Sequence, residues 1–197
     1  MKRSMGKICA ILLCAAMILS CSACESGSGG SSTETDMAVP AKSAETVGNG
    51  KSVYFAGPMF NQAEKEFNVE IAALLEEYGY EVFLPQRDGI EAAQLEGKSE
   101  EELIKMIFDL DSSEVEKADI LFMNLDGRVP DEGACVELGI AYGNGKRCYG
   151  FKTDTRSIET GLDLNPMISG CMIKVFKNND GEQLIKEIKE YLPENEL

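Results

Sequence analysis

The sequence predicts a single doubly wound α/β domain of the flavodoxin-like type, with a five-stranded parallel sheet and helices on both faces. Two observations support this fold class. After residue 51, five short runs rich in β-branched and aromatic residues alternate with longer segments whose apolar residues recur at helical spacing. Parallel neighbouring strands need long crossover connections, and right-handed crossovers place helices on both faces of the sheet.

The first strand and the first helix can be located from residue type and spacing. Residues Ser52–Ala56 (SVYFA) form a β-rich run that ends at Gly57-Pro58. A helix is predicted over Asn61–Tyr78 and ends at Gly79, because apolar residues recur four, three and four residues apart, at Phe67, Ile71, Leu74 and Tyr78.

A second strand and a long helix follow. Residues Tyr80–Leu84 (YEVFL) read as a strand that stops at Pro85. Ser99 and Glu102 have the spacing of a capping box, in which each side chain bonds to the backbone N–H of the other residue. They predict the start of a helix that runs to about Lys117.

The rest of the domain repeats the alternation. Strands are predicted over Asp119–Leu125, Arg147–Phe151 and Met172–Phe176. Helices are predicted over Glu132–Asn144 and Glu182–Leu192. The predicted domain therefore extends over residues 52–197.

Three loops of this domain are predicted to surround one crevice. In doubly wound sheets ligands bind beyond the carboxyl ends of the strands, which here are followed by Ala56–Phe60, Pro85–Gly89 and Leu125–Gly133. None of these loops has the glycine spacing of a dinucleotide-binding or P-loop motif. A site for phosphate cradled by backbone amides is therefore not predicted.

Residues 1–20 resemble a secretory signal peptide. Lys2, Arg3 and Lys7 precede Ile8–Leu19, a run of twelve uncharged residues that is too short to span a bilayer comfortably. A buried helix or a short membrane anchor is the alternative interpretation. Removal of this segment would change the net charge from −15 to −18, since it contains three basic residues and no acidic one.

The residues after the signal predict a lipid anchor and a tether. Ile18-Leu19-Ser20-Cys21 resembles a bacterial lipobox, so Cys21 is the expected site of lipidation and Cys24 the second candidate. Residues 21–51 are rich in Ser, Gly and Thr and poor in large apolar side chains, which predicts a flexible tether. The domain is therefore expected outside the cytoplasm, held to the bacterial cell membrane only through this anchor.

Composition excludes several classes of site. The chain has no histidine, so it cannot form a Ser-His-Asp or Cys-His catalytic system or a zinc site that uses imidazole. With 34 acidic and 19 basic residues, it is also poorly suited to bind nucleic acid or anionic lipid. The three cysteines of the domain, Cys135, Cys148 and Cys171, show no metal-binding spacing and are expected to be core residues. No metal site is predicted.

Glu137 is a carboxylate in an unexpected place. It lies within the apolar stripe of the predicted helix Glu132–Asn144, beside Ala134, Leu138 and Ala141. A helix with so little polar surface should be largely buried, and burial of a carboxylate is costly unless the charge is paired or used. Glu137 is therefore either a functional acid with a raised pKa or the partner of a Lys or Arg.

Two aspartates can likewise be interpreted as either functional or structural residues. Asp111 shares a helical face with Ile104, Phe108 and Val115, although it could simply lie near the end of its helix. Asp131 starts the helix of Glu137, where an aspartate often serves as an N-cap. Spacing alone leaves both interpretations open.

Two segments together resemble the nucleoside 2-deoxyribosyltransferase family. Val53–Phe60 (VYFAGPMF) is similar to the Y-x-A-G-P-x-F loop of that family, and Asp131–Gly139 (DEGACVELG) to its D-x-G-x-x-x-E-x-G motif. Asp111 stands twenty residues before Asp131, at the spacing of the family's upstream aspartate. The resemblance covers roughly residues 52–151 and becomes weaker beyond them.

The resemblance implies a role for each matching residue. Glu137 would be the nucleophile, Asp131 and Asp111 would handle the proton and the base, and Tyr54 would orient Glu137. Three other residues would contact substrate: Phe60 by stacking on the base, Gln86 by a hydrogen bond, and Gly57 in the first loop. Asn165 and Met167 would contact substrate in the site of a neighbouring subunit. The family also implies nucleosides and nucleobases as partners, a homo-oligomer and no cofactor.

The chemistry of these residues agrees with that implication. Cleavage of an N-glycosidic bond needs a carboxylate to capture C1′ and an acid to protonate the leaving base. A second base then gives deoxyribosyl transfer, whereas water gives hydrolysis of a deoxynucleoside or deoxynucleotide. A nucleoside-binding lipoprotein without catalysis is the alternative from a different class of protein.

Overall fold

The computed structural model describes residues 48, 50–154, 156 and 162–197, all of which belong to one compact unit formed by residues 41–197. The predicted signal peptide and the two cysteines predicted as lipidation sites, Cys21 and Cys24, lie outside the described residues. Within the described residues, no helix has both the length and the apolar character needed to cross a membrane.

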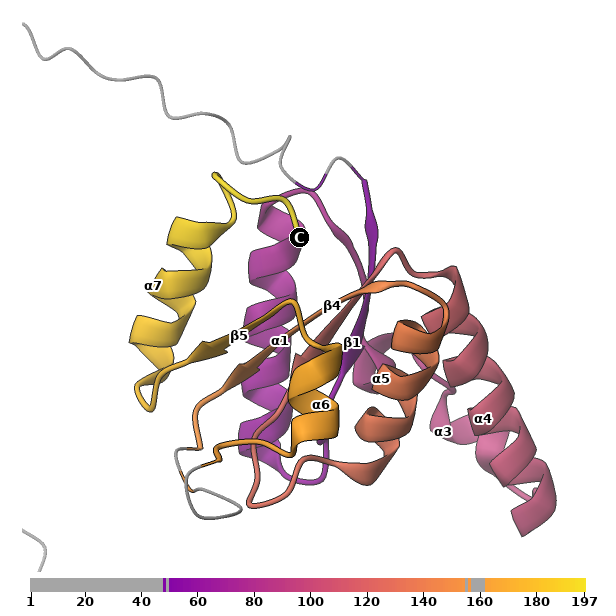
Figure 1. Ribbon diagram of the computed structural model, residues 1–197. Coiled ribbons are helices and arrows are strands. Elements are labelled where there is room, and N and C mark those ends of the chain that lie inside the picture. The colour runs from indigo at the N-terminus through magenta and orange to yellow at the C-terminus, as the bar shows by residue number, and fades with distance from the viewer. Residues whose placement is uncertain (1–47, 49, 155, 157–161) are drawn as a thin grey trace, which may run out of the picture. The chain divides into compact units, whose positions relative to one another are not determined.

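Five parallel strands form one sheet in the order β2-β1-β3-β4-β5 (Figure 1). The strands are β1 (Ser52–Ala56), β2 (Glu81–Phe83), β3 (Ile120–Asn124), β4 (Arg147–Lys152) and β5 (Lys174–Lys177). This order is the flavodoxin-like one, and it places the topological switch point between β1 and β3. The predicted fold class is confirmed.

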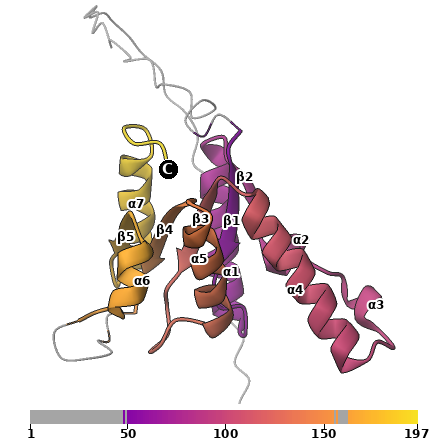
Figure 2. The ribbon, with the colours of Figure 1, turned by 45° about the vertical axis from the view of Figure 1, so that its right-hand side comes forward.

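Helices cover both faces of the sheet (Figure 2). One face carries α1 (Gln62–Glu77) and α7 (Gly181–Tyr191), and the other carries α4 (Glu100–Lys117), α5 (Glu132–Gly143) and α6 (Pro166–Cys171). The capping box predicted at the start of α4 is present, since Ser99 accepts from the backbone N–H of Glu102 and the Glu102 carboxylate accepts in return.

Three short helices were not predicted from the sequence. They are α6 and two single turns, α2 (Pro85–Asp88) and α3 (Ala92–Leu95). Helices of four to six residues are too short to show an apolar period, and a proline at the first helical position can equally mark the end of the preceding strand. Pro85 therefore marks both the end of the segment of β2 and the start of α2.

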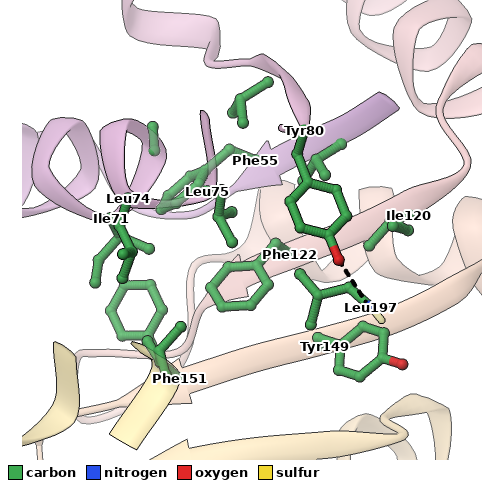
Figure 3. Close-up of a cluster of buried hydrophobic side chains, with 14 of the residues drawn as sticks. Phe55, Ile71, Leu74, Leu75, Tyr80, Ile120, Phe122, Tyr149, Phe151 and Leu197 are labelled. Atoms are coloured by element: carbon green, nitrogen blue, oxygen red, sulfur yellow. Dashed lines mark hydrogen bonds between the residues drawn. The ribbon is translucent and has the colours of Figure 1, made fainter. Parts of the chain in front are cut away.

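The core on the α1 and α7 face is built around three phenylalanines whose rings pack against one another at tilted angles (Figure 3). The ring centroids of Phe55, Phe122 and Phe151 lie 6.0–6.2 Å from one another. At the amino-terminal edge of the sheet, the backbone N–H of buried Leu197 donates to the Tyr80 hydroxyl over 2.9 Å, as Figure 3 shows. Apolar side chains from three central elements thus fix the strands on which the site depends.

The opposite face is less completely covered than the sequence predicts. One stripe of α5 is buried at Ala134, Leu138 and Ala141, but Val136 is 58% exposed. Phe108 of α4 is 59% exposed, because the amino-terminal half of α4 extends beyond the sheet (Figure 2). The prediction that α5 is largely buried is wrong on this side, and an apolar surface is left open between α4 and α5.

Candidate active site

Tyr54 and Glu137 meet between the sheet and α5. Side chains alternate along β1, so Tyr54 points to the α5 face while its neighbours Val53 and Phe55 enter the opposite core. The Tyr54 side chain is fully buried and its ring stacks on Phe83, with the centroids 5.6 Å apart. Its hydroxyl donates a 2.7 Å hydrogen bond to Oε1 of Glu137. A rigid phenol therefore fixes the orientation of this carboxylate.

Burial dominates the electrostatics of Glu137. Loss of hydration raises the pKa of Glu137 to about 7, and the negative charges of Asp111 and Asp131 act in the same direction. The hydrogen bond from Tyr54 opposes them, because it stabilises the charged carboxylate. Among the ion pairs of the described residues none includes Glu137, so the interpretation of Glu137 as the partner of a Lys or Arg is not supported.

Asp111 and Glu137 line the same cavity, of about 470 Å³, between α4 and α5. Asp111 is partly buried in the middle of α4, and burial raises the pKa of its carboxyl group. The rest of the cavity wall is mostly apolar and includes Leu103, Ile104, Ile107, Phe108, Val136 and Ile140. Two acids in an apolar cavity between these helices form an arrangement suited to acid and nucleophilic catalysis.

Asp131 is the N-cap of α5. Its Oδ1 accepts a 2.8 Å hydrogen bond from the backbone N–H of Ala134, so the capping interpretation holds. Glu137 is the sixth residue after Asp131, a distance of about 9 Å along a helix axis. The charge of Asp131 still raises the pKa of Glu137, and a role for Asp131 in proton transfer stays a prediction.

Phe60 and Gln86 lie together, but not in the cavity of Glu137. Both line a groove of about 570 Å³ beside the first turns of α1, and Phe60 is 77% exposed. The Gln86 amide donates to the carbonyl of Lys65 over 2.8 Å and accepts from Asn68 over 3.2 Å. With these partners among the described residues, one hydrogen and one lone pair of the amide are left for a ligand, and contacts of either residue with a base stay predictions.

Asn165 and Met167 lie at the start of α6 on the surface. The Asn165 side chain caps α6 by accepting from the Met167 backbone N–H over 2.9 Å. The Met167 side chain is exposed and does not line the cavity of Glu137 in the same chain. Contact of these residues with substrate, in the same or a neighbouring subunit, therefore stays a prediction.

The sequence prediction missed a buried amide pair close to the strand ends. Asn68 of α1 and Asn124 at the end of β3 are both buried, and the Asn124 amide donates to Oδ1 of Asn68 over 2.8 Å. The available signal was the position of Asn68 in the apolar stripe of α1, three residues before Ile71. A buried asparagine needs hydrogen-bond partners, which here are the loops around the crevice.

Comparisons with known proteins identify the family of the chain. The model of the nucleoside 2-deoxyribosyltransferase family matches residues 53–192. A 2-deoxyribosyltransferase from Bacillus psychrosaccharolyticus is 25% identical, covers 71% of this chain and 91% of its own, and has a TM-score of 0.57. A conserved protein from Enterococcus faecalis V583 is also 25% identical, covers 72% of this chain and 98% of its own, and has a TM-score of 0.53.

A third structure shows the shared fold alone. The 2-desoxiribosyltransferase from Leishmania mexicana is 20% identical, covers 72% of this chain and 98% of its own, and has a TM-score of 0.51. No curated protein matches the chain. Because the family model spans well over half of the sequence and includes Tyr54, Asp111, Asp131 and Glu137, the chain belongs to the nucleoside 2-deoxyribosyltransferase family.

Proposed function

We propose that this protein transfers the 2-deoxyribosyl group between nucleobases through a covalent ester on Glu137. The observation that carries the proposal is the Tyr54–Glu137 hydrogen bond in a cavity shared with Asp111. The partly buried carboxylate has an oriented donor and a second acid beside it, and no cation neutralises it in the described part of the chain. A protein that only binds a nucleoside has no need of this arrangement.

The first half-reaction joins the sugar to the enzyme. A carboxylate oxygen of Glu137 bonds to C1′ as the N-glycosidic bond breaks, and the electron pair of that bond moves to the base nitrogen. Asp111 supplies the proton that the leaving base needs, and burial favours its protonated form because it raises the pKa of the carboxyl group. The products are a deoxyribosyl ester and a free base.

The second half-reaction fixes the outcome. A nitrogen of an incoming base attacks C1′ from the opposite face and releases the Glu137 carboxylate, while the base transfers its proton to Asp111. Two displacements at C1′ give net retention of configuration. If water replaces the incoming base, the same ester is hydrolysed, and this reaction is the second candidate function.

In the first step, the carboxyl groups of Glu137 and Asp111 compete for one proton. Glu137 must be charged and Asp111 protonated, although burial raises the pKa of both. Interacting carboxyl groups titrate as a unit, so the productive form is one of several that share this proton. Tyr54 favours the productive form, because burial and the negative charge of Glu137 raise the pKa of Tyr54 and keep it a donor.

The electrostatics of the loops favour a neutral nucleoside over a 5′-monophosphate. Arg87 is one of two arginines in the loops around the crevice, and its guanidinium is held by Glu76 at 2.8 Å and by Asp88 at 2.9 Å. It also donates to the carbonyl of Val82 over 2.7 Å. A guanidinium with these partners is poorly placed to bind phosphate, and the net charge of −15 adds repulsion.

The proposal is tested by incubating residues 41–197 with deoxyadenosine, with and without cytosine. Deoxycytidine formed only when cytosine is present shows transfer. Adenine released without cytosine shows hydrolysis, the second candidate. Substrate that binds but stays intact under both conditions contradicts the proposal and favours a binding protein.

Tyr54→Phe should shift the pH dependence of turnover. Loss of the donor leaves the ionised Glu137 less stable, so the acid limb of kcat/KM should move to higher pH by roughly one to two units. The measurement is kcat/KM for deoxyadenosine between pH 5 and pH 9. An acid limb that stays in place would show that this hydrogen bond does not control the ionisation of Glu137.

We also propose that a second copy of the chain covers the open surface between α4 and α5. This surface contains exposed Ile104, Ile107, Phe108 and Val136 and is continuous with the cavity of Glu137. An apolar surface beside two acids would otherwise stay hydrated, which weakens electrostatic catalysis. In such a dimer, the exposed Asn165 and Met167 of one copy could contact the substrate bound by the other copy.

Phe108→Glu is expected to convert an oligomer to monomers and to lower kcat/KM by about tenfold or more, since a buried charge without a partner disrupts an apolar interface. Size-exclusion chromatography with light scattering and an activity assay give the two readouts. Ile173→Glu is the control, because Ile173 is 57% exposed and precedes β5 at the opposite edge of the sheet. An unchanged oligomeric state in Phe108→Glu would refute this interface.

The location of the protein is a separate proposal. We infer that the chain is exported and anchored through a lipid on Cys21 or Cys24, because a basic start, an apolar run and a lipobox-like segment follow in that order. Intact mass of the protein purified from membranes identifies the processed cysteine. A mature protein that retains residues 1–20 would contradict the anchor.

A further inference from the structure

Asn68 is a fully hydrogen-bonded amide inside the apolar stripe of α1. Its exposed fraction is 2%, and it shares the buried face of the helix with Ile71 and Leu75. Both hydrogens of its Nδ2 are used, one by the carbonyl of Pro58 at 2.8 Å and one by Oε1 of Gln86 at 3.2 Å. Oδ1 accepts from Asn124 at 2.8 Å. One side chain therefore bonds to groups from three different loops or strand ends.

The network continues beyond Asn68 on both sides. Oδ1 of Asn124 accepts from the backbone N–H of Asp126 over 2.9 Å, and the Asp126 carboxylate accepts from the backbone N–H of Thr153 over 2.6 Å. On the other side, Gln86 donates to the carbonyl of Lys65 in α1. The segments that follow β1, β2, β3 and β4 are thus joined through a single chain of hydrogen bonds.

The loop after β1 is held in one conformation by its contacts with this network. Gly57 has a φ of 154°, and a Cβ at this residue would lie 2.7 Å from Cβ of Asn124. The close approach of Gly57 to Asn124 and the hydrogen bond from Asn68 to Pro58 hold the loop at two consecutive residues. Phe60 stands two residues further on, at the end of the same loop.

We propose that Asn68 is a positioning residue for the nucleobase. It fixes the loop that carries Phe60 and the side chain of Gln86 relative to each other, although it does not itself line the groove that these two residues form. A buried amide is unfavourable unless its partners are held in place, so its presence in the stripe of a core helix indicates that these loops are fixed. This inference rests on the proposed function, which makes Phe60 and Gln86 base contacts.

The test compares Asn68→Leu with Leu75→Ala in the domain of residues 41–197. Asn68→Leu keeps a side chain of similar size but leaves Pro58, Gln86 and Asn124 without their partner. Leu75→Ala removes core volume from the same face of α1, about two turns further along, and controls for lost stability. Asn68→Leu should raise KM for deoxyadenosine about tenfold or more and change kcat less than threefold, the pattern expected when uniform binding is lost.

A second variant and a second readout guard against a folding defect. Asn68→Asp keeps the volume and the acceptor for Asn124 but cannot make both donations, so it should raise KM in the same direction. Hydrogen exchange of the backbone amides at residues 59–62 should accelerate in both Asn68 variants and stay unchanged in Leu75→Ala, whether or not the enzyme turns over.

The outcomes separate this inference from the proposed function. Wild-type protein that neither cleaves nor transfers refutes both. An active wild type with KM and loop exchange in the Asn68 variants equal to those in Leu75→Ala refutes the positioning role alone. A selective rise in KM together with faster loop exchange supports it.

Discussion

Replacing Glu137 with glutamine is expected to lower kcat by a factor on the order of 10⁴ or more, because the variant has no carboxylate to form the ester. The amide keeps the size of the side chain, and its oxygen can still accept from Tyr54. The fold should therefore persist, which far-ultraviolet circular dichroism checks. The measurement is single-turnover release of adenine from deoxyadenosine.

Glu132→Gln is the matched control. Glu132 is an exposed acid in the first turn of the same helix, one and a half turns before Glu137, and its loss should leave turnover within about twofold of wild type. Rapid quenching of the wild type should also give a protein heavier by one deoxyribosyl group, located at Glu137 by peptide mapping. Glu137→Gln with wild-type turnover would refute the covalent mechanism.

Glu137→Gln should also raise the free energy of unfolding near neutral pH. The folded-state pKa of Glu137 is raised from 4.5 to about 7, so ionisation of the folded protein costs more than ionisation of the unfolded chain. The contribution of Glu137 to the free energy of unfolding of the wild type is lost as pH rises from about 4.5 to about 7. Glu137→Gln does not show this loss, because residue 137 cannot ionise in the variant. A catalytic acid held in a cavity at the expense of stability is a common pattern of active sites.

Most of the fold was predictable because each strand and long helix carries its own local signal. The run SVYFA, the capping box at Ser99 and the apolar period of α1 all depend on residues close together in sequence. The strand order β2-β1-β3-β4-β5 is set by crossovers between distant residues, and it was predictable only as part of a fold class.

The site was predictable in part. Motif spacing predicted Tyr54, Asp111, Asp131 and Glu137 as site residues. The structure places the Tyr54 hydroxyl against Glu137, and Asp111 and Glu137 line the same cavity. Periodicity did not reveal which apolar face is covered, since exposed Phe108 and buried Val115 occupy the same face of α4. Burial depends on where α4 passes the edge of the sheet, which local sequence does not encode.

Asp111→Asn is expected to lower kcat for deoxyadenosine by about 10²- to 10³-fold, the range for loss of a general acid. Asparagine keeps the size of the side chain but cannot transfer a proton to the leaving base. Asp109→Asn is the control on the same helix, since Asp109 is exposed and pairs only with Lys105 among the described residues. The measurement is the rate of adenine release in a single turnover.

The role of Asp111 as an acid can be separated from a general effect of its charge by changing the leaving group. With 4-nitrophenyl 2-deoxyriboside, whose leaving group departs without a proton, Asp111→Asn should form the ester within about tenfold of the wild-type rate. Equal defects on both substrates would mean that Asp111 does not donate the proton.

Asp131 provides the final comparison. Asparagine is as good an N-cap as aspartate, so Asp131→Asn preserves the hydrogen bond to Ala134 and removes only the charge. If Asp111 is the acid, Asp131→Asn should lower the pKa of Glu137 and shift the acid limb of kcat/KM to lower pH, without the dependence on leaving group. If the dependence on leaving group follows Asp131 instead, the proton comes from the cap of α5 and the assignment of the two aspartates must be exchanged.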